Sequence, residues 1–340
     1  MSATPPVRRA RRRSGGITLS DVAQLANVAP ITASRALNTP EQVSADVLAR
    51  VRAAVQRTGY VPNLLAGGLA SARSRLVAAV VPTIAGPVFL PTVQSLTEEL
   101  ARRGYQLMLG QSGYADSRED ALLEAIVGRR PDGIVLTGIL HSAQGRRRLL
   151  ASGIPVVETW DLTPTPIDML VGFSHADVGR AVAAHLHARG RRHLAIIAGD
   201  DERAQRRNRA FVDAARSLGL PEPPVVTVPA PTTLKSGRAS LPALLAQGID
   251  GVFCSSDLLA LGVLTEATAR RVKVPKSLAV VGFGDLDFAA DLHPALTTVR
   301  IDGAAMGRQA ARFLIDRAEG RAVEERVVDI GFEIIQRAST

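Results

Sequence analysis

The segment Thr18–Asn38, with the sequence TLSDVAQLANVAPITASRALN, decides how the N-terminal part of this chain folds. Apolar residues recur in it at helical spacing, and the pattern predicts two short helices around a tight turn. Ala23 lies where two helices that cross at a steep angle require a small side chain. Two helices joined in this way are typical of a DNA-binding unit.

The turn between the two helices carries two local signals. Asn27 occupies the position that usually requires a left-handed backbone, which Asn tolerates better than most residues other than Gly. Pro30 suits the first turn of the second helix, because an amide hydrogen would be unpaired there. The inner face of the pair is expected to consist of Leu19, Val22, Leu25, Val28 and Leu37.

A third helix is expected from Ser44 to Thr58, with Ser44 as its cap and Gly59 at its end. Positive charge is concentrated in this N-terminal part. Residues 1–75 contain eleven arginines and three acidic residues, a net charge of +8, which leaves +1 for the other 265 residues. A basic head on a nearly neutral body suits binding to a phosphate backbone. The run from Arg8 to Arg13 can equally be a solvated, disordered tail.

The composition indicates a folded protein of more than one domain. The chain has 340 residues, of which 46% are hydrophobic, enough for one small core and at least one large one. No apolar stretch approaches the length of about 20 residues that spans a bilayer, and no secretory signal is evident, so we expect a cytoplasmic protein without membrane contact. Cys254 is the single cysteine, and its apolar neighbours suggest a buried strand thiol.

From Arg75 onward, short β-branched runs alternate with amphipathic segments. The pattern begins with LVAAVVP at Leu76 and restarts with HLAIIAG at His193. Such alternation predicts parallel sheets built from βαβ units, and two separate halves imply two subdomains with a cleft between them. Ligand-binding residues are expected in the loops at the carboxyl ends of the strands.

The N-terminal motifs resemble the DNA-binding head of the lactose-repressor (LacI/GalR) family of bacterial transcription regulators. DVA at Asp21, SRALN at Ser34 and GYVPN at Gly59 occur in the order and spacing of that family, and the likeness covers nearly everything after Gly16. The resemblance implies an α plus α/β fold, with a helix-turn-helix head joined by a hinge helix to a two-subdomain, periplasmic-binding-protein-like α/β domain. The expected parts are a disordered basic arm (1–16), a helix-turn-helix domain (17–62), a hinge (63–73), and an effector-binding and dimerisation domain (74–340) with subdomains of about 74–172 plus 301–329 and 173–300 plus 330–340.

The resemblance also implies which residues contact DNA. Pro30, Ile31 and Arg35 match positions that face base edges in the major groove, where Arg35 can bind a guanine through two donors or clamp a phosphate. The chain departs from the common pattern at Ala29, where a Ser would cap the helix. The expected DNA-binding residues are Thr18, Ser20, Pro30, Ile31, Thr32, Ser34, Arg35, Asn38, Asn63 and the hinge leucine Leu69. The implied partner is a palindromic double-stranded operator, bound by a homodimer.

For the cleft, Arg207 matches the arginine with which this family clamps its effector. Gly284 stands where sugar-binding relatives keep an aspartate, and arginines are concentrated between 203 and 209. Both features favour an anionic ligand over a neutral sugar, although Arg206 and Arg209 can also be the solvent face of a helix. The expected effector-binding residues are Phe89, Trp160, Asp161, Arg203, Arg207, Ser256, Asp257 and Asp285, of which Asp257 can instead support its loop structurally.

Within the family, the body is most similar to the repressors of gluconate utilisation. The motifs that carry this likeness are GYQLML at Gly104, VPTIAGPVF at Val81, VGF at Val171, DER at Asp201, DGVFCSSDLLALG at Asp250 and VDIGF at Val328. They imply a small-molecule effector that is a sugar acid, such as gluconate or its 6-phosphate, and repression of sugar-acid catabolic genes.

Two other functions remain open. A periplasmic-type solute-binding protein shares the expected fold, and fold alone does not fix function, but the basic head disfavours it. A global DNA-binding regulator with a cleft that no longer responds to ligand is the second alternative. We expect no enzyme, cofactor or metal site, because His185 and His187 lie two residues apart on an expected helix and so face different sides.

Overall fold

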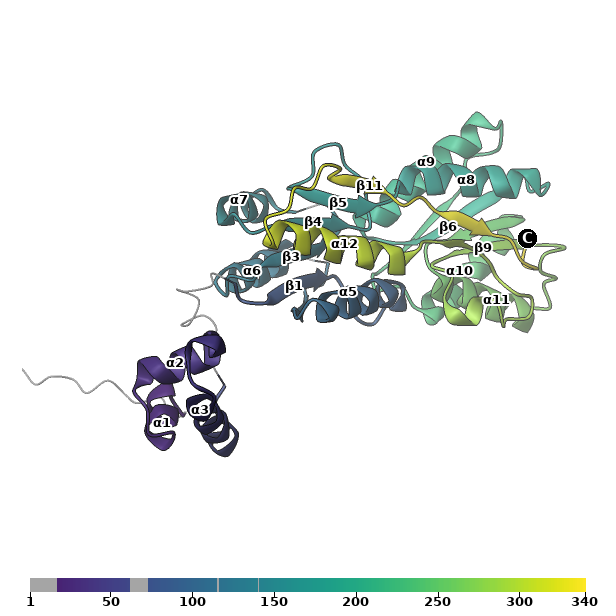
Figure 1. Cartoon of the computed structure of the whole chain (residues 1–340). Coiled ribbons are helices and arrows are strands. Elements are labelled where there is room, and N and C mark those ends of the chain that lie inside the picture. The colour runs from purple at the N-terminus through teal and green to yellow at the C-terminus, as the bar shows by residue number, and fades with distance from the viewer. Residues whose placement is uncertain (1–16, 62–72, 115, 140) are drawn as a thin grey trace, which may run out of the picture. The chain divides into compact units, whose positions relative to one another are not determined.

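The computed structural model describes residues 17–61, 73–114, 116–139 and 141–340. The chain divides between Ser74 and Arg75 into two compact units, which we call the head and the body (Figure 1). The predicted basic arm at residues 1–16 lies outside the described residues, and so do the predicted DNA contacts Asn63 and Leu69.

The head consists of three helices whose ends are set by local sequence signals. The helices are α1 (Leu19–Leu25), α2 (Pro30–Asn38) and α3 (Ala45–Thr58), with a short 3-10 turn at Pro40–Gln42. Asn27 has a φ of 53°, as its place in the turn predicts. Ser44 caps α3 by accepting a hydrogen bond from the Val47 amide, and Gly59 ends α3 with a φ of 64°. The predicted turn, cap and helix end are therefore confirmed.

The core of the head is made of small side chains. Val22 and Val51 are fully buried together with five alanines, which are Ala23, Ala26, Ala33, Ala36 and Ala54. The prediction that Leu25 belongs to the inner face is wrong, since this side chain is 40% exposed. Leu25 and Ala26 lie three and four residues after Val22, and both spacings suit one helix face. The close crossing of the helices admits Ala26 and leaves Leu25 outside.

The body contains two six-stranded sheets. The first has the spatial order β11 (Val327–Asp329), β5 (Met169–Gly172), β4 (Val156–Thr159), β3 (Gly133–Thr137), β1 (Leu76–Val81) and β2 (Gln106–Gln111). The second has the order β12 (Glu333–Ile335), β10 (Thr297–Arg300), β9 (Ala279–Phe283), β8 (Gly251–Cys254), β6 (Leu194–Gly199) and β7 (Val225–Val228). All described pairings are parallel except that of β10 with β12.

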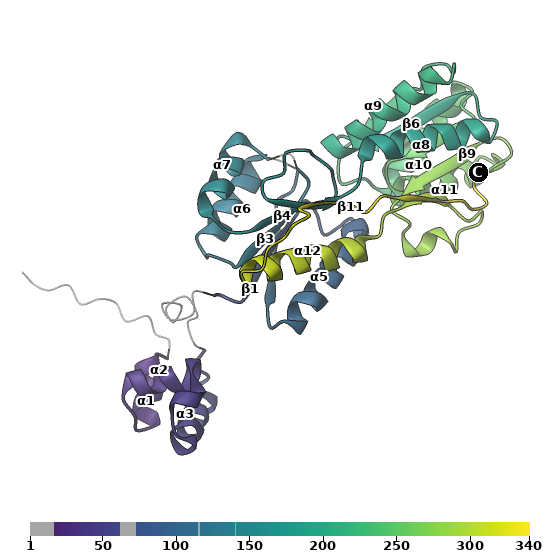
Figure 2. The same cartoon turned by 45° about the horizontal axis from the view of Figure 1, so that its top comes forward.

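Helices cover both faces of each sheet because the strands are apolar on both sides. In β1, Val77 and Ala79 face one layer while Ala78 and Val80 face the other. The first sheet lies between α5 (Leu90–Arg102) with α12 (Gly303–Ala318) and α6 (Asp116–Val127) with α7 (Ala143–Ser152) (Figure 2). The second lies between α8 (His175–Ala188) with α9 (Glu202–Ser217) and α10 (Leu234–Ala246) with α11 (Asp257–Ala269).

The chain passes between the two halves of the body three times. It leaves the first sheet after β5, returns to it through α12 after β10, and leaves again between β11 and β12. The predicted fold class, a helix-turn-helix head with a two-subdomain α/β body, is confirmed. In the described part of the chain, no helix combines the length and the apolar character that crossing a bilayer requires.

Helices α8 and α9 pack unusually closely at Gly179. A Cβ atom at this position would lie 2.3 Å from the backbone oxygen of Arg207, and neither backbone can give way easily. Ala normally stabilises a helix interior by about 1 kcal/mol relative to Gly. We expect Gly179→Ala to do the opposite, lowering the free energy of unfolding of the body by about 1–3 kcal/mol.

Urea unfolding measures this effect. The exposed Ala184→Gly on the same helix serves as the control, because it reports helix propensity without a packing change. A more stable Gly179→Ala protein would contradict the close approach of the two helices.

A buried histidine ties three segments of the first half together. The His141 side chain is 2% exposed, with Nδ1 2.6 Å from Glu119 Oε1 on α6 and Nε2 3.4 Å from Glu158 Oε1 on β4. Burial opposes the charged form, but hydrogen bonds and charge from Glu119 and Glu158 outweigh it and raise the pKa of His141 to about 9. His141 is therefore protonated at neutral pH.

This pKa shift makes part of the stability of the body dependent on pH. Because the pKa of the folded state exceeds the unfolded value of about 6.5, the contribution is complete below pH 6.5 and is lost as the pH rises through 9. It amounts to about 3 kcal/mol. We expect the difference in unfolding free energy between wild type and His141→Gln to shrink by this amount between pH 6 and pH 9.5. An equal difference at both pH values would show that His141 is not charged in the folded protein.

Candidate functional site

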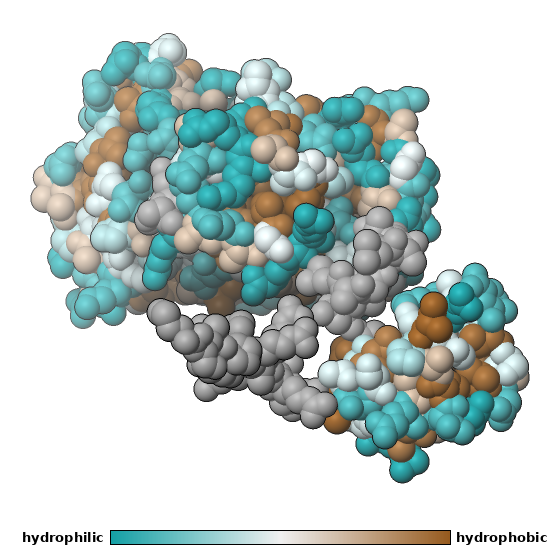
Figure 3. All heavy atoms as spheres, turned by 90° about the vertical axis from the view of Figure 1, so that its left-hand side faces the viewer, coloured by the Kyte–Doolittle hydropathy of each residue, from teal (hydrophilic) through white to brown (hydrophobic). Residues whose placement is uncertain are grey.

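The predicted DNA-binding residues of the head form part of its surface. Thr18, Ser20, Pro30, Ile31, Arg35 and Asn38 are exposed, while Thr32 and Ser34 are half-buried. Ile31 is 63% exposed and lies one turn before Arg35, so an apolar group and a guanidinium occupy the same face of α2. Figure 3 shows apolar patches among hydrophilic side chains on the surface of the head.

A residue that sequence reasoning missed holds α1 in place. Arg50 of α3 donates hydrogen bonds from Nη1 to the backbone oxygens of Ala26 and Asn27, at 3.2 and 3.5 Å. These oxygens lie at the C-terminal end of α1, where cations and donors are favoured. Arg50 therefore fixes the turn from which α2 starts, and only the fold brings it there.

The start of α2 has no side-chain cap. Ala29 occupies the capping position, with extended φ and ψ values of −66° and 149°, and it has no side chain that could accept a hydrogen bond. Ala29→Ser should supply that acceptor to the amide of Thr32 and stabilise the head by about 0.5–2 kcal/mol. Native-state hydrogen exchange should show slower exchange of the amides in α1 and α2.

Ala29→Gly is the matched control, since it has no acceptor in its side chain and changes the backbone alone. Exchange rates of Ala29→Ser equal to those of wild type would show that the serine does not cap α2.

The body contains a cavity of about 90 Å³ to which both halves contribute. Its walls include Thr83, Phe89 and Trp160 from the first half and Arg203, Arg207 and Phe283 from the second. A single buried water requires about 10–15 Å³, so the cavity has room for several waters. A second, polar cavity of about 330 Å³ adjoins it and shares Tyr114, Asp201 and Arg203.

The structure brings most of the predicted effector-binding residues together. Phe89, Trp160, Arg203, Arg207 and Ser256 line the first cavity, and Asp161 lines the second. Phe89 packs edge-on against Trp160, with ring centroids 5.0 Å apart. The indole Nε1 donates to Thr92 Oγ1 at 3.1 Å, which fixes the plane of the tryptophan ring.

Two predicted residues, Asp257 and Asp285, do not line either cavity. Asp257 is fully buried and accepts hydrogen bonds from Thr298 Oγ1 at 2.6 Å and from the Leu286 amide at 2.8 Å. Burial raises the pKa of its carboxyl group to about 6. The Asp285 carboxylate pairs with Arg300 at 2.6 Å and with Arg337 at 2.7 Å. Both acids therefore support the loops behind the cavity wall.

Arg207 is the most unusual charge in the cavity, because it is 5% exposed and its hydrogen bonds go to neutral groups. Nη1 lies 2.9 Å from His175 Nδ1, and Nη2 lies 3.5 Å from the backbone oxygen of Ser255. The guanidinium lies over the ring of Phe283, 4.2 Å from its centroid. Among the described residues, no carboxylate oxygen is within 4.0 Å of its nitrogens, and Nε has no hydrogen-bond partner. Burial lowers the pKa of Arg207 to about 10, so it is charged at neutral pH.

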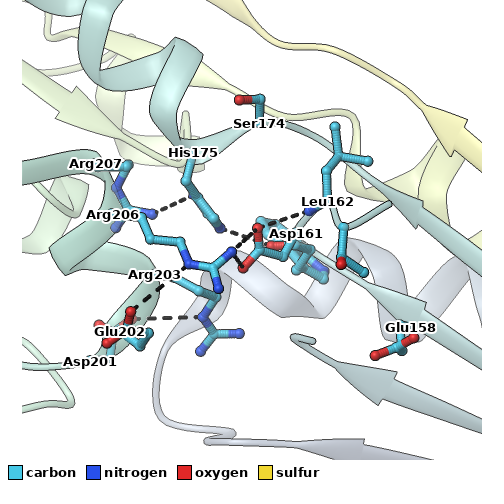
Figure 4. Close-up of polar contacts among 12 residues, drawn as sticks. Glu158, Asp161, Leu162, Ser174, His175, Asp201, Glu202, Arg203, Arg206 and Arg207 are labelled. Carbon is cyan, nitrogen blue, oxygen red and sulfur yellow. Dashed lines mark hydrogen bonds and ion pairs between the residues drawn. The ribbon is translucent and has the colours of Figure 1, made fainter. Parts of the chain in front are cut away.

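The neighbouring arginines differ from Arg207 in their partners. Arg206 pairs with the buried Asp161 at 3.3 Å, and Arg209 pairs with Glu202 at 3.1 Å with its side chain 60% exposed (Figure 4 shows the first pair). Arg203 lies over the ring of Phe89 at 5.4 Å, and its Nε is 3.7 Å from Asp201. The solvent-face interpretation thus suits Arg209, whereas Arg206 joins α9 to the first half of the body.

Sequence reasoning missed several residues of the cavity wall, among them His175, Tyr114 and Phe283. Phe283 is the last residue of β9, so it fits the expectation that ligand-binding residues lie at the carboxyl ends of the strands. His175 begins α8, directly after the first crossing between the halves, where no strand-end rule applies. Its role becomes visible only from its contact with Arg207.

Comparisons with known proteins agree with this architecture. Residues 18–63 match the family described as bacterial regulatory proteins, lacI family, and residues 183–340 match the periplasmic binding protein-like domain. The HTH-type transcriptional regulator GntR of Pseudomonas aeruginosa is 38% identical over 333 residues, which cover 97% of each chain. GntR of Escherichia coli strain K12 is 32% identical over 93% of this chain and 96% of the other. A crystal structure of a LacI-family regulator from Silicibacter pomeroyi has a TM-score of 0.90 at 30% identity and covers 95% of this chain and 99% of that one.

The chain therefore belongs to the LacI family of bacterial regulatory proteins. It is a DNA-binding transcriptional regulator, with a helix-turn-helix head and an effector-binding body of the periplasmic-binding type.

Proposed function

We propose that this regulator is a homodimeric, cytoplasmic repressor of sugar-acid catabolic genes, and that its effector is a sugar acid such as gluconate or its 6-phosphate. The similarity to GntR proteins over nearly the whole chain supports this class of regulator. The palindromic operator contacts the exposed face of α2, where Arg35 binds a guanine or a phosphate and Ile31 makes apolar contacts.

The observation that carries the choice of effector is the buried guanidinium of Arg207. Removing a charge from water costs several kcal/mol unless a partner compensates for it. The groups that contact Arg207 are neutral, namely an imidazole, a carbonyl and an aromatic ring. Asp201 and Asp161 favour the charged form of Arg207 from a longer distance. An anionic ligand supplies a counter-charge in direct contact, and a carboxylate matches the planar, two-point geometry of a guanidinium.

The rest of the cavity suits the polyhydroxy part of a sugar acid. Thr83, Thr232 and Ser256 place hydroxyl groups along the wall, and Phe89 and Trp160 offer apolar faces for C–H groups. Asp201 is engaged by the Ala204 amide at 3.1 Å as the cap of α9, and Arg203 lies 3.7 Å from it. Arg203 can approach the same anion, because its buried Nη1 has no hydrogen-bond partner among the residues that the structure describes.

Calorimetry with matched ligands tests the anionic effector. Sorbitol has the same hydroxylated chain as gluconate with a neutral terminal group in place of the carboxylate. We expect gluconate or 6-phosphogluconate to bind at least about 100-fold more tightly than sorbitol or glucose, because only the acids pair with Arg207. Arg207→Ala should abolish this preference.

Arg209→Ala is the control, since Arg209 lies on the same helix and its side chain is 60% exposed. A second readout is the affinity of the protein for operator DNA, with the operator selected from random duplexes. Adding the acid should change this affinity in wild type and leave it unchanged in Arg207→Ala. Equal binding of sorbitol and gluconate would overturn the anionic effector. If no acid changed operator binding, the result would support the alternative of a global DNA-binding regulator whose cleft does not respond to ligand.

A further inference from the structure

His175 connects the arginine of the cavity to the first half of the body. It is the first residue of α8 and is 3% exposed. Its Nδ1 lies 2.9 Å from Arg207 Nη1, and its Nε2 lies 2.9 Å from the backbone oxygen of Trp160. Figure 4 shows the imidazole beside the side chain of Arg207.

The two partners of His175 determine where its proton lies. A carbonyl oxygen can only accept a hydrogen bond, so Nε2 carries the hydrogen and donates it to Trp160. A guanidinium can only donate, so Nδ1 presents its lone pair to Arg207. The ring must therefore be neutral. Burial, followed by the charge of Arg207, holds the pKa of His175 well below its usual value, which agrees with this arrangement.

Helix packing brings the imidazole within reach of Arg207. Gly179 lies one turn after His175 on the same face of α8, and it lets the backbone of α9 approach at Arg207. The ring of Phe173, two residues before His175, packs edge-on against the imidazole with centroids 4.6 Å apart. The position of Nδ1 is thus set by the backbone of α8 and by the ring of Phe173.

His175 in turn restricts the guanidinium. Of the five N–H donors of Arg207, one points to His175 and one to the Ser255 oxygen. The ring of Phe283 covers one face of the group at 4.2 Å. Among the residues that the structure describes, the donor at Nε and the remaining donors of Nη1 and Nη2 have no hydrogen-bond partner, and these contacts restrict the plane of the guanidinium.

We propose that His175 is a positioning residue for the effector, which orients the guanidinium of Arg207 so that a carboxylate binds it through two hydrogen bonds. This inference rests on the proposed anionic effector and adds a residue to its recognition. His175 is neutral and therefore contributes no charge of its own to ligand binding. It acts by accepting a hydrogen bond from Arg207 while the carbonyl of Trp160 holds its other nitrogen.

Two substitutions separate the two hydrogen bonds of the imidazole. Asn places its Oδ1 near the position of Nδ1, so His175→Asn keeps an acceptor for Arg207 and loses the bond to Trp160. Gln places its amide nitrogen near the position of Nε2, so His175→Gln keeps the donor to Trp160 and loses the acceptor for Arg207. Each variant keeps one hydrogen bond and a polar side chain, so both should lose similar stability.

Calorimetry of the full chain with gluconate, 6-phosphogluconate and sorbitol distinguishes positioning from a structural role. We expect His175→Asn to bind the acid within about threefold of wild type and His175→Gln to bind it about 10- to 100-fold more weakly, the usual effect of losing a hydrogen bond to a charged group. The preference for acid over sorbitol should fall in His175→Gln alone. Urea unfolding of both variants provides the stability comparison.

The ring itself offers a readout that needs no ligand. Nitrogen NMR of the ligand-free protein should show His175 as the neutral tautomer protonated at Nε2, still neutral at pH 6, where an imidazole with the ordinary pKa is mostly charged. A titrating ring, or the opposite tautomer, would overturn the proposal. Acid binding that is equal in the two variants, or that simply follows their stability, would also overturn it. If wild type bound none of the acids, the proposed effector would be wrong and this inference would fall with it.

Discussion

Arg207 places a buried guanidinium ion between the two halves of the body, and none of the described residues brings a carboxylate into contact with it. The contacts of Arg207 are neutral dipoles, an imidazole lone pair and a carbonyl oxygen, together with the face of Phe283. They satisfy part of the hydrogen-bonding capacity of the group but carry no opposite charge, which comes only from the carboxylates of Asp201 and Asp161 at a longer distance. The pKa of Arg207 falls to about 10 but stays far above neutrality, so the charge persists. An anion bound in the cavity therefore meets an electrostatic demand that already exists, and little reorganisation is required of the protein.

The same arginine lies at the joint between the two halves of the body. Arg206 and Arg207 are neighbours on α9, and both connect to the turn after β4, which belongs to the first sheet. Arg206 pairs with Asp161 directly, whereas Arg207 reaches the Trp160 carbonyl through His175. Trp160 has a φ of 67°, an uncommon backbone conformation for a residue with a side chain, so its carbonyl is held by its surroundings. Arg206 and Arg207 therefore take part in the contact between the halves. The first sheet begins with β1 at Leu76, directly after the segment that leads to the head.

The sequence predicts what local patterns determine. Asn27, Pro30 and Gly59 act through their backbone preferences and Ser44 acts through its side-chain cap. The helices of the head begin and end where these residues require. Strand ends locate Arg203, Arg207 and Trp160 near one cavity, because parallel strands bring their carboxyl ends together. The same rule also selects Asp257 and Asp285, since position after a strand does not say which way a side chain turns. Asp257 turns towards Thr298 and Asp285 towards Arg300 and Arg337, contacts between residues far apart in the chain. His175 escaped prediction for a related reason, because its function depends on how α8 crosses α9.

Positive charge contributes to binding through different physical effects in the head and in the body. The described part of the head presents arginines at its surface, where water and salt screen them over about 8 Å at physiological ionic strength. Such charges attract a polyanion through their number, and each contact releases counterions from DNA. The effector proposed for the cavity pairs instead with one or two buried arginines, where a single correctly oriented ion pair is stronger than at the surface. A small acid offers one or two charges and cannot compete through number, so its recognition requires a fixed guanidinium. In the fold, Arg207 is contacted by the neutral groups His175 and Phe283, and Gly179 lets its backbone approach α8.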